Sequence, residues 1–202
     1  ALGKMVMEAA SKHLTPVVLE LGGKSPCIID QDADLKVAAK RVAWGKALNA
    51  GQTCIAPDYL MIHEDVKDKF LQLLVQEWKN LLGDDPKAAK HFVRIVSDKA
   101  LERLISYLPT SEPLNSKASE PSELLNSEAS IYHGGHYDRA ERYLSPTILT
   151  DVSPDAPVMQ EEIFGPIFPV LTFKQIEEVT EFVAKRERAL ALYYFGKHGD
   201  YI

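Results

Sequence analysis

Short aliphatic segments alternate with helical segments along most of this chain. The segments that predict strands are residues 17–21, 26–29, 58–63, the end of 143–150, 167–173 and 190–195. The segments with helical spacing are residues 4–13, 35–48, 65–82, 98–107 and 174–186. Strands that alternate with helices are typical of α/β proteins, because a crossover helix returns the chain parallel to the preceding strand. The sequence therefore predicts an α/β fold with a mostly parallel, Rossmann-like sheet flanked by helices.

Two segments in this pattern carry more detailed predictions. Residues 35–48 are apolar on much of the helix circumference, which predicts a largely buried helix. In residues 167–173, Pro169 has no backbone N–H to donate, so we expect this strand to lie at a sheet edge or to contain a bulge.

Residues 109–130 interrupt the pattern. They contain six Ser, three Pro and four Glu but no aromatic residue. Residues 111–119 and 122–130 are near copies that agree at seven of nine positions. A segment this polar cannot bury enough apolar surface to offset the entropy that it would lose on ordering. We therefore expect a duplicated, flexible surface insertion.

The composition limits the partners and the compartment. A formal net charge of −6 argues against nucleic acid or an anionic membrane as a general partner. No apolar run approaches the ~18 residues that a membrane helix needs. Because Cys27 and Cys54 are the only cysteines, a disulfide framework is not expected, and a reducing compartment such as the cytoplasm fits better.

Two polar residues stand where loops often present chemistry. Glu20 leaves an aliphatic segment and is followed by Gly22 and Gly23, where the backbone can turn sharply. Cys54 follows a glycine in a loop between a predicted helix and a predicted strand. A thiol and a carboxylate that met in one cleft would form a nucleophile and its general base. The alternative is an ordinary strand exit and a small buried cysteine.

Longer motifs surround both residues. Residues 20–26 read Glu-Leu-Gly-Gly-Lys-Ser-Pro, residues 51–59 read Gly-Gln-Thr-Cys-Ile-Ala-Pro-Asp-Tyr, and residues 160–166 read Gln-Glu-Glu-Ile-Phe-Gly-Pro. In this order the three motifs resemble the signature motifs of the aldehyde dehydrogenase superfamily. The second motif is most similar to the class 3 or fatty-aldehyde branch. The resemblance covers nearly the whole chain apart from the insertion, whereas the chain covers less than half of such an enzyme.

The resemblance implies an enzyme that oxidises aldehydes to carboxylic acids with NAD or NADP. Cys54 would add to the aldehyde carbon to form a thiohemiacetal, and hydride transfer to the nicotinamide would leave a thioester. Glu20 would then act as the general base that activates water to hydrolyse this thioester.

The resemblance also implies four residues of the cofactor site. Glu162 would bind the nicotinamide ribose, and Phe164 would pack near the nicotinamide ring. Leu21 would contact the cofactor as well. Gly3 would also face it, because Gly3 matches the last glycine of a family turn that faces the dinucleotide. Without the resemblance, Glu162 would be interpreted as a helix-capping carboxylate and Phe164 as a core aromatic.

The domain organisation follows from the same resemblance. Residues 1–22 would be the C-terminal remnant of a dinucleotide-binding domain. Residues 23–202 would be a catalytic domain that is incomplete at its C-terminus. The expected partners are a small aliphatic or aromatic aldehyde and, in the full-length protein, a second copy in a homodimer. Membrane attachment would need a segment outside this sequence and is undetermined.

Two other functions stay open. One is a non-catalytic truncated fragment or interaction module of the same fold, and the other is a semialdehyde dehydrogenase of a neighbouring branch. No metal site is expected, since His133 and His136 lack a further ligand at diagnostic spacing. We expect Cys27 to be buried and Lys24 to be solvated.

Overall fold

The computed structural model of the protein describes residues 2–109 and 129–197. The strands are β1 (Pro26–Ile29), β2 (Tyr59–His63), β3 (Ser130–His133), β4 (Tyr137–Asp138), β5 (Tyr143–Leu144), β6 (Thr147–Thr150), β7 (Ile167–Phe173) and β8 (Tyr193–Phe195). The α-helices are α1 (Leu2–Ser11), α2 (Leu35–Ala47), α3 (Lys67–Leu82), α4 (Asp98–Ile105) and α6 (Ile176–Ala184). Short 3-10 helices occupy Leu48–Gly51, Glu64–Val66 and Pro157–Met159.

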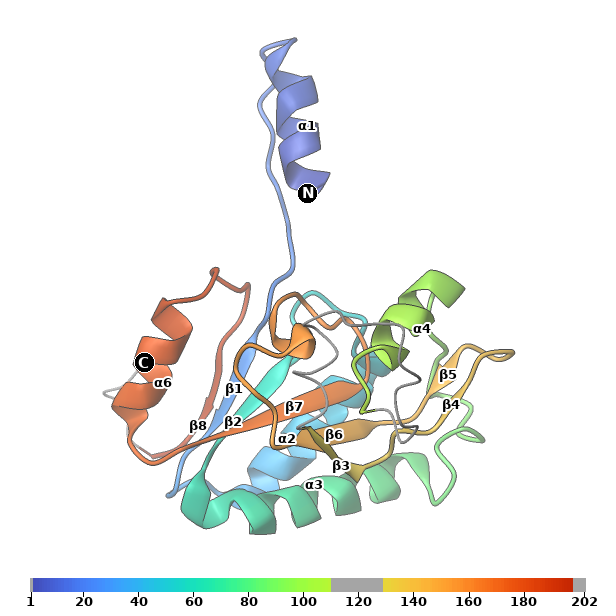
Figure 1. The fold of residues 1–202 in the computed structure, drawn as a ribbon, viewed down its shortest axis with the longest axis vertical. Coiled ribbons are helices and arrows are strands. Elements are labelled where there is room, and N and C mark those ends of the chain that lie inside the picture. Colours follow the sequence, from blue (N-terminus) through green and yellow to red (C-terminus); the bar gives the residue numbers. More distant parts are fainter. Residues whose placement is uncertain (1, 110–128, 198–202) are drawn as a thin grey trace, which may run out of the picture.

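The strands form one main sheet in the order β3-β6-β7-β2-β1-β8, and β4 pairs separately with β5. Neighbours from β6 to β8 are parallel, while β3 runs antiparallel to β6 at one edge. Helix α2 connects β1 to β2, and α6 connects β7 to β8 (Figure 1). The prediction of a mostly parallel α/β sheet flanked by helices is therefore confirmed.

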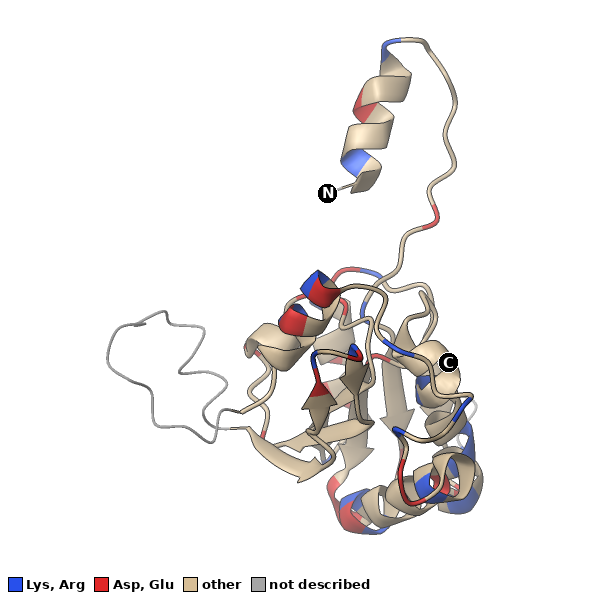
Figure 2. Ribbon diagram, turned by 90° about the vertical axis from the view of Figure 1, so that its right-hand side faces the viewer, with Lys and Arg blue, Asp and Glu red and all other residues tan. Residues whose placement is uncertain are grey.

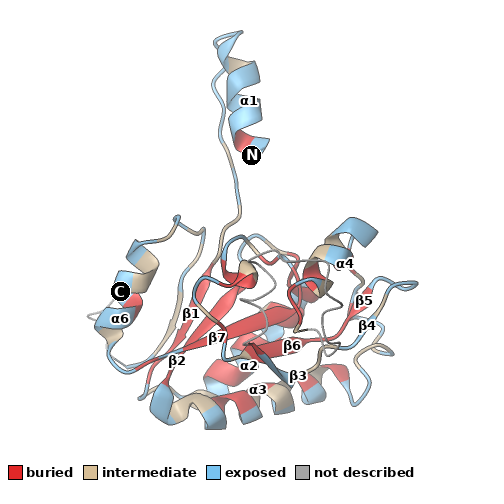
Figure 3. Cartoon of the chain, viewed as in Figure 1, coloured by how far each residue is buried: buried red, intermediate tan, exposed pale blue. Residues whose placement is uncertain are grey.

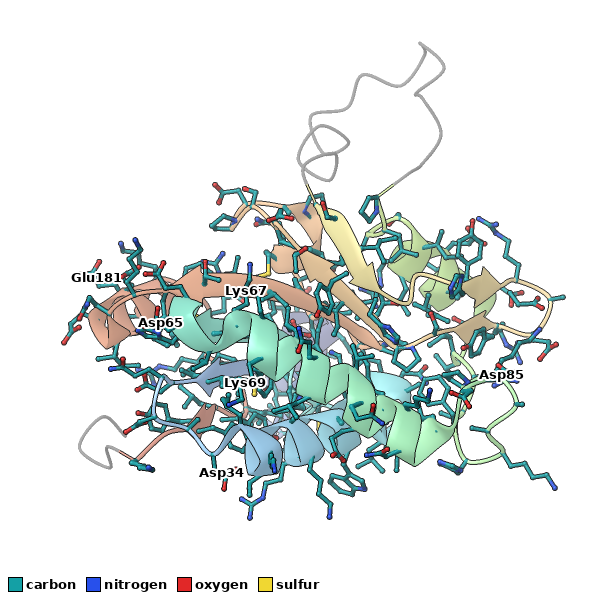
Figure 4. All side chains as sticks on the ribbon, turned by 90° about the horizontal axis from the view of Figure 1, so that it is seen from below. Asp34, Asp65, Lys67, Lys69, Asp85 and Glu181 are labelled. Carbon is teal, nitrogen blue, oxygen red and sulfur yellow. The ribbon has the colours of Figure 1, made fainter. Side chains whose placement is uncertain are left out.

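Helices cover both faces of this sheet. On one face, the Phe168 ring of β7 stacks on Trp78 of α3 with 6.0 Å between ring centroids. On the other face, the Tyr59 ring of β2 meets Phe182 of α6 edge-on, also at 6.0 Å. Figure 4, seen from below, shows α3 lying across the sheet with Lys67 and Lys69 near its first turn. Asp34 caps α2 beside it by accepting from the backbone N–H groups of residues 36 and 37.

The core lies between these layers. Every residue of β1 and β2 is buried, and β7 is buried except at one position (Figure 3). Strands buried on both faces are expected where helices cover both sides of a parallel sheet. Charged residues of both signs are interspersed on the outer surfaces of α3 and α4 (Figure 2). In the part of the chain that the structure describes, no helix is long and apolar enough to cross a membrane.

The prediction of a first strand at residues 17–21 is wrong. Residues 17–21 are not a strand, because no described segment pairs with them; they belong to an extended linker between α1 and β1. This linker holds α1 away from the rest of the molecule (Figure 1). Helix α1 packs against its own linker, since a Cβ built on Gly3 would lie 3.0 Å from Leu21 Cδ1 and 3.3 Å from Leu19 Cδ1.

Two further expectations need correction. Strand β7 is an internal strand, although Pro169 lies within it. Its pairing with β6 ends at Pro169, and its pairing with β2 begins at Val170, so the missing N–H falls where the two ladders change over. Helix α2 is only half buried, because its outer face leaves Val37 43% and Trp44 58% exposed.

The other predicted elements are present, with ends that differ by a few residues. Helix α3 ends at Gly83, whose φ of 80° suits glycine. Most of the predicted flexible insertion, residues 110–128, lies outside the described residues.

Candidate active site

The three sequence motifs precede three neighbouring parallel strands. Glu20 comes before β1, Cys54 before β2, and the segment 161–165 before β7, and these strands are adjacent in the order β7-β2-β1. In register, Pro26 pairs with Tyr59. Because parallel strands begin at the same edge of a sheet, the fold brings the three motifs to one edge, above β1 and β2 in Figure 1.

The loop that carries Cys54 has an unusual backbone. Asn49, Ala50 and Gly51 have φ values of 52°, 52° and 72°, which place three consecutive residues in the left-handed region. Non-glycine residues rarely adopt this conformation, and it persists only where the surroundings impose it. The surroundings here are close: a Cβ on Gly51 would lie 2.4 Å from the backbone oxygen of Gly165.

Gln52 anchors this loop to the body of the protein. Its side-chain oxygen accepts from the backbone N–H of Val96 at 2.9 Å. Its side-chain nitrogen donates to the carbonyl of Asn49 at 3.0 Å and to that of Arg94 at 3.2 Å. All polar atoms of the amide therefore serve to hold the loop in place.

Cys54 itself lies in an exposed turn and is not in a disulfide. The N–H of Ala56 donates to the carbonyl of Thr53 at 2.9 Å, which closes the turn around Cys54 and Ile55. The Tyr193 hydroxyl of β8 donates to the Ile55 carbonyl at 2.5 Å and ties the turn to the sheet. The thiol is thus presented to solvent by a held backbone, and the alternative of a buried Cys54 is wrong.

Lys46 lies beneath the loop and is 1% exposed. Its ammonium donates to the carbonyl of Pro57 at 2.8 Å and to that of Asp58 at 3.4 Å, and it lies 4.5 Å from the centre of the Phe168 ring. Burial lowers the pKa of Lys46 to about 8, against the opposing effect of Asp58. Lys46 therefore connects the end of α2 to the far end of the Cys54 loop.

Lys24 is largely buried, so the expectation that it is solvated is wrong. Its side chain is 10% exposed and its ammonium contacts the Asp58 carboxylate at 2.5 Å. It also donates to the carbonyls of Val158 at 2.8 Å and Glu161 at 3.0 Å, so all three of its donors are used. The other Asp58 oxygen accepts from the Ile163 N–H at 2.8 Å. Burial lowers the pKa of Lys24, and the Asp58 charge opposes this.

Glu162 and Phe164 do not fit their simpler interpretations. The Glu162 carboxylate lies against Gly22, where a Cβ would be only 2.3 Å from Oε2, and it caps none of the described helices. Burial raises the pKa of Glu162, and the Gly23 backbone N–H opposes this by hydrogen bonding. Phe164 is 38% exposed with a φ of 50°, so it is not a core aromatic.

The segment 162–165 links the two candidate catalytic residues. Glu162 contacts Gly22, two residues after Glu20, and Gly165 contacts Gly51, three residues before Cys54. Three residues span at most ~10 Å, so these contacts bring the two chain segments to one region. Glu20 is exposed, and no hydrogen bond or ion pair joins it to Cys54.

The two remaining candidates lie together. Gly3 of α1 is buried against Leu21, as described for the linker. Glu20 lies between Leu19 and Leu21 on the linker and is exposed.

An apolar groove of about 870 Å³ lies beside the Cys54 turn. Both sequence neighbours of Cys54 line it, as do residues of α2 and β8. Its large apolar and aromatic side chains include Trp44, Leu48, Ile55, Leu192, Tyr193 and Phe195, and the basic residues Lys40 and Arg41 also line it. Within residues 2–109 and 129–197, no group of three or more His, Cys, Asp or Glu residues could hold a metal ion. Cys27 is fully buried, as expected, and burial raises the pKa of its thiol.

Sequence reasoning missed the residues that hold the motifs together. Lys46, Asp58 and Arg103 all contact backbone carbonyls or N–H groups of the motif segments. The sequence did contain a signal for Lys46 and Asp58, because each is a charged residue in an otherwise apolar segment. Such residues are seldom buried unless they are paired, so a buried contact could have been expected. Arg103 carried no signal, because it is one of several charged residues on an amphipathic helix.

Comparisons with known proteins agree with the three motifs. The sequence model of the aldehyde dehydrogenase family matches residues 1–201. The mouse protein "Aldehyde dehydrogenase, dimeric NADP-preferring" is 43% identical over 202 residues, which are 100% of this chain and 41% of that protein. The mouse "Aldehyde dehydrogenase family 3 member A2" is 46% identical over the whole chain and 38% of its own length.

A solved structure agrees as well. The structure "Substrate bound state of Staphylococcus Aureus AldH" superposes with a TM-score of 0.86 at 42% identity, over 99% of this chain and 40% of that one. The chain therefore spans about two fifths of the length of the relatives that it matches.

The buried ion pair predicts a large stability effect. Lys24→Met leaves the Asp58 carboxylate buried without its partner, so we expect the free energy of unfolding to fall by about 3–5 kcal/mol. Lys79→Met is the matched control: it removes an ion pair with Asp84 whose side chains are 58% and 83% exposed, and it should leave the free energy of unfolding almost unchanged because water screens the pair. Urea denaturation measures both, and equal losses would contradict the role of the pair.

The raised pKa of Glu162 predicts a pH dependence. Its carboxylate is harder to ionise in the folded than in the unfolded protein, so ionised Glu162 destabilises the fold above its folded pKa. Glu162→Gln should therefore stabilise the protein at neutral pH, and this gain should vanish as the pH falls below the unfolded pKa. Glu181→Gln, at a 73% exposed side chain, is the control that should show no such trend in urea titrations across pH. A gain that grows on acidification would contradict the assignment.

Proposed function

The chain belongs to the aldehyde dehydrogenase family, and from that premise we propose that this protein oxidises aldehydes to carboxylic acids with NAD or NADP. The observation that carries the proposal is the meeting of the three motifs at one edge of the sheet, next to an apolar groove. The proposal assigns the nucleophile to Cys54, the general base to Glu20 and cofactor contacts to Glu162, Phe164, Leu21 and Gly3.

Cys54 begins the proposed reaction. Its thiolate adds to the aldehyde carbon, so a C–S bond forms and the carbonyl π-electrons move to oxygen. The resulting oxyanion needs hydrogen-bond donors, and the Cys54 backbone N–H is one candidate. The held backbone of residues 49–56 supports this role, because a nucleophile on a fixed turn needs little reorganisation during attack.

The residues at positions 162 and 164 fit a nicotinamide cofactor. A half-buried carboxylate can accept hydrogen bonds from ribose hydroxyls, and an exposed aromatic ring offers an apolar surface to the nicotinamide. The absence of a side chain at Gly22 leaves the space that the Glu162 carboxylate occupies. When bound, NAD or NADP would supply the hydride acceptor that converts the thiohemiacetal on Cys54 into a thioester.

Glu20 completes the proposed reaction as a base. It takes a proton from water while the water oxygen attacks the thioester carbon, and the Cys54 thiolate leaves as the carboxylic acid forms. Glu20 is exposed on the linker, so water can reach it.

The apolar groove is the proposed site for the organic part of the aldehyde. Aromatic and aliphatic side chains make up most of its lining, and the exposed Lys40 and Arg41 of α2 also line it. The apolar part of this lining suits an aliphatic or aromatic chain, which is the substrate class that we propose.

Assembly and location are further parts of the proposal. The printed name of the mouse relative describes it as dimeric, and β8 has a free edge among the described residues, which together support a homodimer. Two cysteines without disulfides support a reducing compartment, and so a cytoplasmic location.

A second candidate function is an interaction module without turnover. The exposed apolar side chains of α1, among them Leu2 at 69% and Met5 at 65%, favour this alternative. Thiol chemistry at Cys54 separates the two functions.

The first test is the relative reactivity of the two thiols. Iodoacetamide should label Cys54 much faster than Cys27 in the folded protein, because the first is exposed and the second is fully buried. Mass spectrometry of peptides after timed quenching measures both rates. An unfolded sample in urea is the control, in which the two rates should converge. Equal labelling of the folded protein would contradict a presented nucleophile.

The second test is hydrolysis of an activated ester, which needs the thiol and the base but no cofactor. Cys54→Ala should abolish the activity, while Glu20→Gln should leave the first acylation burst and slow the steady state by about a hundredfold. Glu8→Gln, at an exposed glutamate of α1, is the matched control and should behave like the wild type. Hydrolysis that survives in Cys54→Ala would refute the proposed nucleophile.

A further inference from the structure

The segment that carries Glu162 and Phe164 has no regular structure of its own. Residues 161–164 belong to neither a helix nor a strand. Phe164 keeps a left-handed backbone with φ 50° and an exposed side chain. Such a conformation is unfavourable for a bulky residue and requires support from outside the segment.

On its inner side, the segment is held by the buried ion pair. Asp58 accepts from the Ile163 N–H, and Lys24 donates to the Glu161 carbonyl. These bonds fix the amide of Ile163 and the start of the segment. They leave the carbonyls of Glu162 and Ile163 to be satisfied from elsewhere.

On its outer side, Arg103 of α4 supplies the missing donors. One terminal nitrogen of its guanidinium donates to the Glu162 carbonyl at 3.2 Å, and the other donates to the Ile163 carbonyl at 2.7 Å. The first nitrogen also donates to the Tyr107 hydroxyl at 2.9 Å, and that hydroxyl donates to the Glu161 carboxylate at 3.0 Å. A planar guanidinium can hold two adjacent carbonyls at once, which an ammonium cannot do with the same geometry.

Helix α4 is itself fixed against the segment. Leu101 and Leu104 on its inner face are 1% and 0% exposed. A Cβ built on Gly165 would lie 2.5 Å from a methyl group of Leu104, so the helix packs directly on the residue after Phe164. The packing of α4 therefore fixes the backbone from which the Arg103 side chain extends.

We propose that Arg103 is a positioning residue: its guanidinium holds the carbonyls of Glu162 and Ile163, and so keeps the Glu162 carboxylate against the Gly22–Gly23 turn and Phe164 exposed. Only the meaning of this position for cofactor binding rests on the proposed function. The placement of the segment by Arg103 stands on the contacts alone.

Hydrogen exchange in the whole 202-residue chain tests the placement. In Arg103→Ala, the Ile163 amide should exchange at least about tenfold faster, because losing the guanidinium bonds to the carbonyls of Glu162 and Ile163 makes it easier for the segment to open and release the Ile163 N–H from Asp58. The amides of β2 and β7 should keep their protection. Methylguanidinium added below denaturing concentrations should restore the protection of Ile163, and Arg103→Lys should restore it in part.

Arg139→Ala is the matched control. It removes a guanidinium that pairs, at 2.7 Å and 3.2 Å, with Glu102 of α4, the helix that also carries Arg103. Unlike Arg103, Arg139 makes no hydrogen bond to the described residues 162–165. The control should leave the exchange of residues 162–165 unchanged. The proposal is overturned if Ile163 keeps its protection in Arg103→Ala, or loses it only in step with β2 and β7.

Calorimetric titration with NAD separates this inference from the proposed function. If the chain binds NAD, Arg103→Ala should weaken the affinity by about tenfold and Arg139→Ala should not, which supports both. If neither the wild type nor the variants bind NAD, the exchange result still decides the role of Arg103, and only the proposed cofactor contact loses support. Equal, measurable NAD affinity in the wild type and in Arg103→Ala would refute the link between this placement and cofactor binding.

Discussion

The ion pair between Lys24 and Asp58 joins three chain segments that lie far apart in the sequence. Lys24 belongs to the turn before β1, Asp58 to the end of the Cys54 loop, and their shared partners to the segment before β7. A charge removed from water is costly unless it is paired and hydrogen-bonded. Lys24 and Asp58 are fully hydrogen-bonded only when all three segments are in their native positions. The pair therefore specifies the arrangement of the motifs as well as stabilising it.

The placement of these motifs departs from the usual arrangement of α/β sheets. Ligands in such sheets commonly bind at the carboxyl ends of the strands, where the N-termini of the crossover helices favour anions. Here the motifs precede their strands, and the Cys54 loop follows the C-terminal end of α2. The helix end that precedes the thiol is therefore a C-terminus, whose partial negative charge does not favour a thiolate. The site depends instead on contacts within and between loops, such as those of Gln52 and Lys46.

The sequence was sufficient for the sheet, the order of its elements and the motifs, because periodicity and glycine positions are local properties. It was misleading at Pro169, since whether a missing N–H is tolerated depends on where two ladders meet. It failed at Lys24, which looks solvated beside a glycine and is buried by residues more than a hundred positions away. The work of Arg103 also depends on tertiary contacts. Pairings of this range leave no periodic trace in a single sequence.

The linker that carries Glu20 has a consequence for the two halves of the proposed reaction. The Cys54 thiol lies on a loop that is held against the sheet, whereas the Glu20 carboxylate lies on the linker between α1 and β1. In the proposed reaction, formation of the acyl group and its release would therefore depend on separately anchored parts of the molecule. Because residues 17–21 pair with no strand among the described residues, movement of this linker would change the reach of the proposed base, and with it how long an acyl group stays on the sulfur, without altering how the sulfur acquires it.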